Sequence, residues 1–170
     1  MKRITILLSF ISTAFALNAQ SVDEGVQQMY YERYQSADNT FHKILQQDPN
    51  NATAWYYLEK DYLLENKPDK ASDSIQRVPA SVKNDPWYKV AYGTVLMQQG
   101  KKDEAGNYFN DAIKDTREKN AGILSSVADA QIHSKSGDIN YAIDLLNKAI
   151  KRNKKNSINT IEVSPFFPSI

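Results

Sequence analysis

The sequence predicts an all-α fold, a stack of antiparallel helix pairs built from one repeated unit. Four alanines recur along the 170-residue chain at separations of 34, 34 and 37 residues: Ala37, Ala71, Ala105 and Ala142. Each is followed by an apolar or aromatic residue four positions later and by an apolar residue seven positions later, which is alanine in the last two units. At these spacings the three residues of a unit lie on one helical face. Asn66, Gly100 and Gly137, five residues before the last three alanines, are typical of the break between a leading and a trailing helix.

Composition limits the class of protein before any motif is considered. A chain with 41% hydrophobic and 24% charged residues is long and apolar enough for one ordinary domain with a core. Its net charge of +1 provides no field that would attract nucleic acid. The absence of cysteine excludes disulfides, thiolate nucleophiles and cysteine-ligated metals.

The N-terminus reads as a targeting segment, residues 1–19. Lys2 and Arg3 precede an apolar stretch over residues 4–17, and Ala19 offers a cleavage position. That stretch is shorter than the ~20 apolar residues of a transmembrane helix, and no later segment is long and apolar enough, so no stable membrane insertion is expected. We therefore expect an exported protein, most simply a periplasmic one, with a repeat domain over residues 20–156.

Helix starts can be placed from capping residues. Side chains or prolines that suit a helix N-terminus stand where five of the helices should begin: Ser21, Asn51, Pro68, Asp85 and Asp138. Ser21 and Glu24 together form a capping box. Three extra residues near positions 118–121 account for the longer last separation.

This pattern resembles the tetratricopeptide repeat family over residues 21 to about 156, roughly three and a half to four repeats. The residues that carry the resemblance are Pro49 in the first unit, Trp55, Leu58, Tyr62 and Ala71 in the second, and Gly93, Gly100, Ala105, Phe109 and Ala112 in the third. Gln28, Glu59 and Asp129 depart from the family pattern. The resemblance implies a right-handed superhelical α-solenoid; the alternative is a helical bundle with a chance period.

No pattern in the sequence indicates catalysis. His42 and His133 are 91 residues apart and show no metal-ligand spacing, and His133 is interpreted as a packing histidine. Nucleophile-elbow and phosphate-loop motifs are absent. We therefore expect that the chain is not an enzyme and that it needs neither a metal nor a cofactor.

The family resemblance implies a concave groove, lined by the leading helices, that holds a peptide or helix of another protein. The residues projected into it are Tyr56, Lys60, Leu63, Trp87, Val90, Thr94, Met97, Val127 and Gln131. Aromatic and Met side chains suit hydrophobic recognition. The other interpretation of these residues is packing between repeats. The expected function is thus a non-catalytic protein–protein interaction scaffold; the alternative is a periplasmic holding chaperone or an anionic-polymer-binding module.

A cluster of cations lies near the end of the repeats. It consists of Lys148, Lys151, Arg152, Lys154 and Lys155. These residues either form a solvated helix C-terminus that opposes the helix dipole or contact an anionic partner. The following tail, residues 157–170, carries Phe166 and Phe167 between two prolines. It could fold back, mediate self-association, or mark a truncated piece of a longer array.

Overall fold

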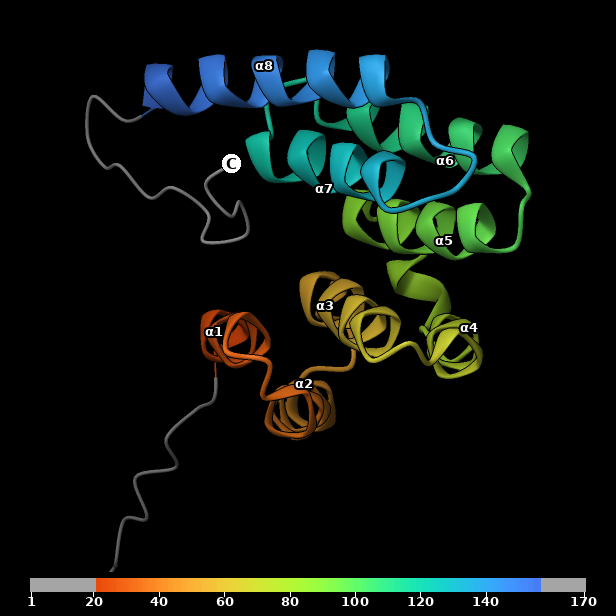
Figure 1. The fold of residues 1–170 in the computed structure, drawn as a ribbon. Coiled ribbons are helices and arrows are strands. Elements are labelled where there is room, and N and C mark those ends of the chain that lie inside the picture. The colour runs from red at the N-terminus through yellow and green to blue at the C-terminus, as the bar shows by residue number, and fades with distance from the viewer. Residues whose placement is uncertain (1–20, 157–170) are drawn as a thin grey trace, which may run out of the picture.

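The computed structural model describes residues 21–156, with side chains up to residue 154. This part of the chain is all-α, with eight α-helices and one short 3-10 helix, Ala80–Val82 (Figure 1). The helices are α1 (Val22–Tyr30), α2 (Tyr34–Gln47), α3 (Ala52–Leu64), α4 (Pro68–Gln76), α5 (Pro86–Gln98), α6 (Lys102–Asp115), α7 (Ala121–Ile132) and α8 (Ile139–Asn156). The predicted targeting segment and the tail lie outside the described residues.

The helices are paired as the repeat predicts. α1 packs on α2, α3 on α4, α5 on α6 and α7 on α8, and neighbouring pairs then stack on one another (Figure 1). Within the stack the leading helices α1, α3, α5 and α7 follow one another side by side, and each trailing helix also contacts the next leading helix. The predicted fold class, stacked helix pairs amounting to about four repeats, is confirmed.

The four repeated alanines are all completely buried. Ala37, Ala71, Ala105 and Ala142 have no exposed surface and belong to one continuous apolar core. Because a methyl group takes little room, it lets the two helices of a unit approach closely. The alanine register therefore marks the contact within each pair, as predicted.

Two glycines explain how large rings fit into this contact. In the first unit the ring of Phe41 lies where a side chain on Gly25 would be. In the third, a Cβ on Gly93 would lie 2.6 Å from Cε1 of Phe109. In both pairs the phenylalanine follows the glycine by 16 residues. The phenylalanine of α2 and that of α6 fit only because a glycine, with no side chain, stands opposite them on the leading helix.

The second and fourth units fill the same contact differently. There the corresponding pairs are Glu59 with Ile75 and Ala130 with Leu146. Glu59, Ile75 and Ala130 are buried and Leu146 is partly exposed. A larger residue on the leading helix is thus matched by a smaller one on the trailing helix.

The capping predictions hold at each predicted helix start. Side-chain oxygens accept backbone N–H groups at four of them: Ser21 from Glu24 (3.1 Å), Asn51 from Ala54 (2.9 Å), Asp85 from Trp87 (2.8 Å) and Asp138 from Tyr141 (3.0 Å). Pro68 is the first residue of α4. The Glu24 carboxylate accepts from the Gln28 side chain at 3.2 Å.

The turns between the leading and trailing helices of the units have two different backbone conformations. Asn66 and Gly100 adopt φ angles of 58° and 78°, the left-handed conformation expected of them, and Glu32 in the first unit does the same at 56°. Gly137 does not. A Cβ on Gly137 would collide with the carbonyl of Gln131, so this glycine is needed for close backbone approach.

The longer connection before the last unit lies where the sequence predicts it. Arg117 and Glu118 follow α6 with φ angles of 51° and 56°, and Asn120 then caps α7 by accepting the N–H of Ile123. Among residues 21–156, none of the helices combines the length and apolar character that a bilayer crossing requires.

Candidate binding surface

The leading helices α3, α5 and α7 carry all nine residues that the sequence projects into a groove. Four of them are partly exposed: Lys60, Leu63, Trp87 and Thr94. We call these four the leading-helix face. The other five are buried, namely Tyr56, Val90, Met97, Val127 and Gln131. For those five, packing between repeats, the alternative interpretation from the sequence, describes their surroundings in this structure.

Aromatic rings fill the space between the leading helices. The Trp87 ring on α5 lies 5.0 Å from the Tyr56 ring and 6.2 Å from the Tyr57 ring of α3, measured between centroids. On its other side, a Cβ on Gly122 of α7 would lie 3.1 Å from Cη2 of Trp87. Trp87 therefore fixes the spacing of three helices while part of its ring reaches solvent.

Two polar side chains among the nine, Thr94 and Gln131, form hydrogen bonds within the fold. Thr94 donates its hydroxyl to the carbonyl of Val90 at 2.9 Å, within α5. Gln131 accepts the N–H of Asp138 at 2.9 Å and so holds the connection between α7 and α8. Gln131 is therefore buried and hydrogen-bonded within the fold and does not face an open surface.

An ion pair crosses the leading-helix face from α3 to α7. Nζ of Lys60 donates to Oδ2 of Asp129 at 2.8 Å. Nδ1 of His133, one turn further along α7, lies 3.3 Å from Oδ1 of Asp129 and 3.0 Å from its backbone carbonyl. His133 is largely exposed, so the prediction that it packs in the core is wrong; it belongs to this charged cluster instead.

The cluster perturbs the ionisation of its members. Burial alone would raise the pKa of Asp129, but the hydrogen bond from His133 and the charge of Lys60 outweigh it and hold that pKa at about 2. The hydrogen bond to Asp129 in turn raises the pKa of His133. Asp129 is therefore an anion at neutral pH, and the charge of Lys60 balances it.

A second acid lies beneath this cluster. Glu59 is completely buried, and neither oxygen of its carboxyl group has a hydrogen-bond partner. Burial raises its pKa far above the usual range; nearby Lys60 opposes that shift and Asp129 reinforces it. The sequence showed Glu59 and Asp129 only as departures from the repeat pattern. Lys60, which pairs with Asp129, is 69 residues away from it, so the sequence does not reveal the cluster.

Some of the cations near the end of α8 contact other residues of the chain, and others are exposed to solvent. Lys148 pairs with Asp144 at 3.2 Å and with Glu118 at 3.7 Å, and Arg152 donates to the carbonyl of Glu118 at 3.0 Å. Lys151 and Lys154 are exposed. The side chain of Lys155 lies outside the described residues.

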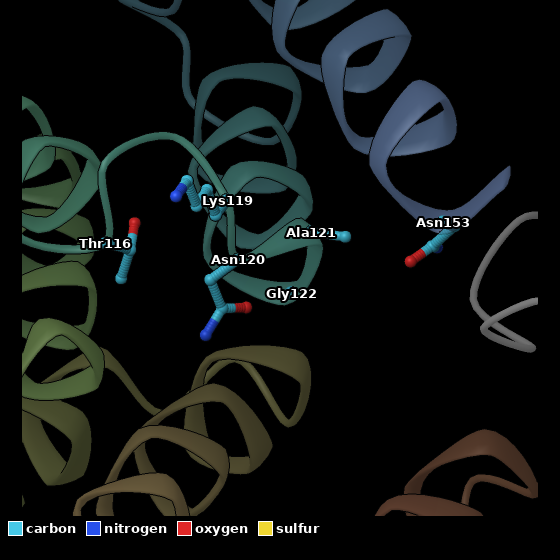
Figure 2. A pocket seen from close by; sticks show the side chains of 6 residues that line it. All are labelled: Thr116, Lys119, Asn120, Ala121, Gly122 and Asn153. Atoms are coloured by element: carbon cyan, nitrogen blue, oxygen red, sulfur yellow. The ribbon is translucent and has the colours of Figure 1, made fainter. Parts of the chain in front are cut away.

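An open pocket of about 600 Å³ lies beside the connection between α6 and α7 (Figure 2). It is lined by Thr116, Lys119, Asn120, Ala121, Gly122 and Asn153. Thr116 donates to carbonyls of α6 and Asn120 caps α7, so both are engaged at helix ends. The lining includes no acid or histidine that could serve in acid–base catalysis. Within the described part of the chain, no three or more ligand-type side chains gather as a metal site would require.

Comparison with known proteins identifies the repeat. Residues 29–91, from the end of α1 into α5, match the tetratricopeptide repeat family. Over these residues the match agrees with the prediction of a non-catalytic repeat scaffold. No curated protein matches the chain.

Solved structures of the protein MamA show a weaker likeness. One has 19% identity over 83% of both chains with a TM-score of 0.47, and a second has 19% identity over 84% of this chain and 76% of that one with a TM-score of 0.46. A third, of "MamA MSR-1 C2", has 17% identity over 84% and 83% with a TM-score of 0.43.

Proposed function

We propose that this chain, whose residues 29–91 match the tetratricopeptide repeat family, is a scaffold that binds a peptide or helix of another protein on its leading-helix face. The observation that carries the proposal is the exposure of Lys60, Leu63, Trp87 and Thr94 on two neighbouring leading helices. A partly exposed tryptophan held by packed rings is the kind of rigid anchor that dominates protein interfaces.

The charges of the site indicate the chemistry of the partner. Lys60 and Asp129 neutralise one another at 2.8 Å, and burial raises the pKa of nearby Glu59 well above its usual range. A surface of this kind offers aliphatic and aromatic contact with a balanced ion pair at one edge. It suits an apolar segment with a few hydrogen-bonding groups better than a strongly charged one.

The alternative of anionic-polymer binding has less support. Lys148 and Arg152, two of the five cations that would carry it, are engaged with Asp144 and Glu118. Of the other three, Lys151 and Lys154 are exposed and the side chain of Lys155 lies outside the described residues, so the described part of the patch is small for a polyanion.

Export is part of the proposal. It rests on the N-terminal pattern of Lys2 and Arg3, the apolar stretch and Ala19. Cleavage near Ala19 would release the repeats into the periplasm, where the partner should then be sought. N-terminal sequencing of the protein recovered from that fraction would test it; a chain that keeps Met1 would contradict it.

Affinity capture with matched surface variants tests the binding site. Leu63→Glu with Thr94→Glu places charge on the leading-helix face, whereas Gln76→Glu adds the same kind of charge to exposed surface on α4. We expect one dominant partner that the wild type and Gln76→Glu retain and the double variant loses. Equal capture by all three proteins, with unchanged melting curves, would contradict the site, and a broad set of clients would favour a chaperone.

A further inference from the structure

The last helix, α8, carries a stripe of exposed aliphatic side chains. Ile139, Ile143 and Ile150 are 53%, 52% and 53% exposed, and Leu146 between them is partly exposed. Steps of four, three and four residues place these four side chains on one side of the helix. Single exposed apolar residues are ordinary, but an aligned row of four is typical of an interaction surface.

Earlier units show what normally covers this side of a trailing helix. Counted from the repeated alanines, Leu146 and Ile150 correspond to Phe41 and Leu45 in α2 and to Phe109 and Ile113 in α6. Those four residues are only 0%, 7%, 1% and 8% exposed. Phe41 and Phe109 pack against Gly25 and Gly93 of their own units, and α2 and α6 in addition contact the next leading helix, α3 and α7. Within residues 21–156, no further unit follows α8 to cover its stripe in the same way.

The stripe is also longer than stacking requires. At the position of Ile143, α2 and α6 have Asp38 and Gly106, and at the position of Ile139, α6 has Lys102. At the latter position α2 has Tyr34, so the last unit has aliphatic side chains where α6 is polar or small and where α2 has an acid and an aromatic ring.

We propose that α8 pairs in antiparallel fashion with α8 of a second copy of this chain, forming a two-fold symmetric dimer. The midpoint of the stripe, between Ile143 and Leu146, would lie on the symmetry axis, so that Ile139 of each copy faces Ile150 of the other. A self-complementary stripe of this kind closes after two copies, as a two-fold contact requires.

Charge selects the direction of the pairing. Residues 138–146 contain Asp138 and Asp144 and no cation, whereas residues 147–156 contain five cations and no acid. Two of the five, Lys148 and Arg152, also contact Asp144 or Glu118 of the same chain. Antiparallel helices place each basic half beside the acidic half of the partner and oppose the helix dipoles, while parallel helices would place the two basic halves together.

Head-to-tail stacking of α1 on α8 fits less well. The exposed residues of α1 are Asp23, Glu24, Gln27 and Tyr30, which form no aliphatic row to cover the stripe. The proposed pairing is independent of the leading-helix face and of any partner bound there.

Cysteine cross-linking of the full chain tests the arrangement, since the chain has no cysteine of its own. Under mild oxidation Ile143→Cys, close to the axis, should form a covalent dimer. Ile139→Cys alone should not, because its two copies would be about 11 residues, or about 16 Å, apart along the helices. A mixture of Ile139→Cys and Ile150→Cys chains should cross-link. Dimers from Ile139→Cys alone would indicate parallel helices and overturn the proposal, as would no dimer from Ile143→Cys.

Light scattering provides a second measurement, on chains that carry no cross-link. The wild type should have twice the monomer mass, Ile143→Glu with Ile150→Glu should have the monomer mass, and Ile132→Glu, which alters an exposed isoleucine of α7, should remain dimeric. A monomeric wild type, for example with the tail of the same chain on the stripe, would refute the pairing. A dimer that survives the double substitution would refute it equally.

Discussion

Lys60 and Asp129 form an ion pair of 2.8 Å although 69 residues separate them in the sequence. Lys60 belongs to α3 and Asp129 to α7, so the pair reaches across α5, the leading helix between them. Val90 and Met97 of α5 are buried in this region. The leading helices are therefore joined to one another across two repeats, in addition to the contacts between neighbours.

A double-mutant cycle measures this link directly. Lys60→Ala, Asp129→Ala and the double variant should give a coupling free energy of about 1 kcal/mol, because both side chains are at least two-thirds buried. The exposed pair Lys148 and Asp144 provides a matched control, for which we expect at most about 0.5 kcal/mol. Equal coupling in both cycles, measured by urea unfolding, would mean that the pair across α5 has no special role.

The ionisation of His133 reports on the same cluster. Its hydrogen bond to Asp129 raises the pKa of His133 in the folded protein. The stability it contributes should therefore be fully present below the unfolded pKa and be lost as pH rises through the folded pKa. In an NMR titration, Asp129→Asn should lower the His133 pKa, whereas Asp144→Asn should leave it unchanged. An unaltered His133 titration in Asp129→Asn would contradict the cluster.

A buried acid on the other side of α3 makes stability depend on pH. Asp61 is completely buried with no hydrogen-bond partner for its carboxyl oxygens. Burial, reinforced by Glu65 and Asp38 and opposed by Lys67, raises its pKa to about 8. Since the folded pKa exceeds the unfolded one, stability is present at low pH and is lost as pH rises towards 8.

Asp61→Asn isolates that effect. Between pH 5 and 7 the wild type should lose about 1.4 kcal/mol of unfolding free energy per pH unit relative to the variant. Chemical unfolding of both proteins at several pH values provides the measurement, and Asp69→Asn on exposed α4 surface is the control. Parallel stability curves for the wild type and Asp61→Asn would show that Asp61 ionises normally.

Glycine substitutions test the contact inside each helix pair. Gly93→Ala places a Cβ 2.6 Å from Phe109 and should lower stability by about 1–3 kcal/mol. Gly106→Ala, on α6 with no atom within 4 Å of the new Cβ, should instead gain about 0.5–1 kcal/mol. Adding Phe109→Leu to Gly93→Ala recreates the Ala130 and Leu146 pair of the fourth unit and should recover most of the loss. Similar melting temperatures for both single variants would contradict the packing.

Features that depend on nearby residues were predictable from the sequence. The buried alanines, the caps at Asn51 and Asp138, and the left-handed Asn66 follow from spacing and from local backbone chemistry. The left-handed Glu32 was missed, because a glutamate gives no sign of that conformation.

The surface was harder to predict than the fold. The repeat pattern assigns Val90 and Val127 to the groove, yet both are completely buried. How closely α3 and α7 approach across α5 is decided by Trp87 and by the Lys60–Asp129 pair, which are contacts between different units. A one-dimensional register contains no information about such distances.

Site-specific photo-cross-linking tests the central claim, that a partner protein binds the leading-helix face. A photoreactive residue at Thr94 on α5 should give one covalent adduct of defined mass in cells, and the same residue at exposed Asp73 on α4 should give none. Adducts of equal yield from both positions, or an adduct from Asp73 alone, would contradict binding at this face.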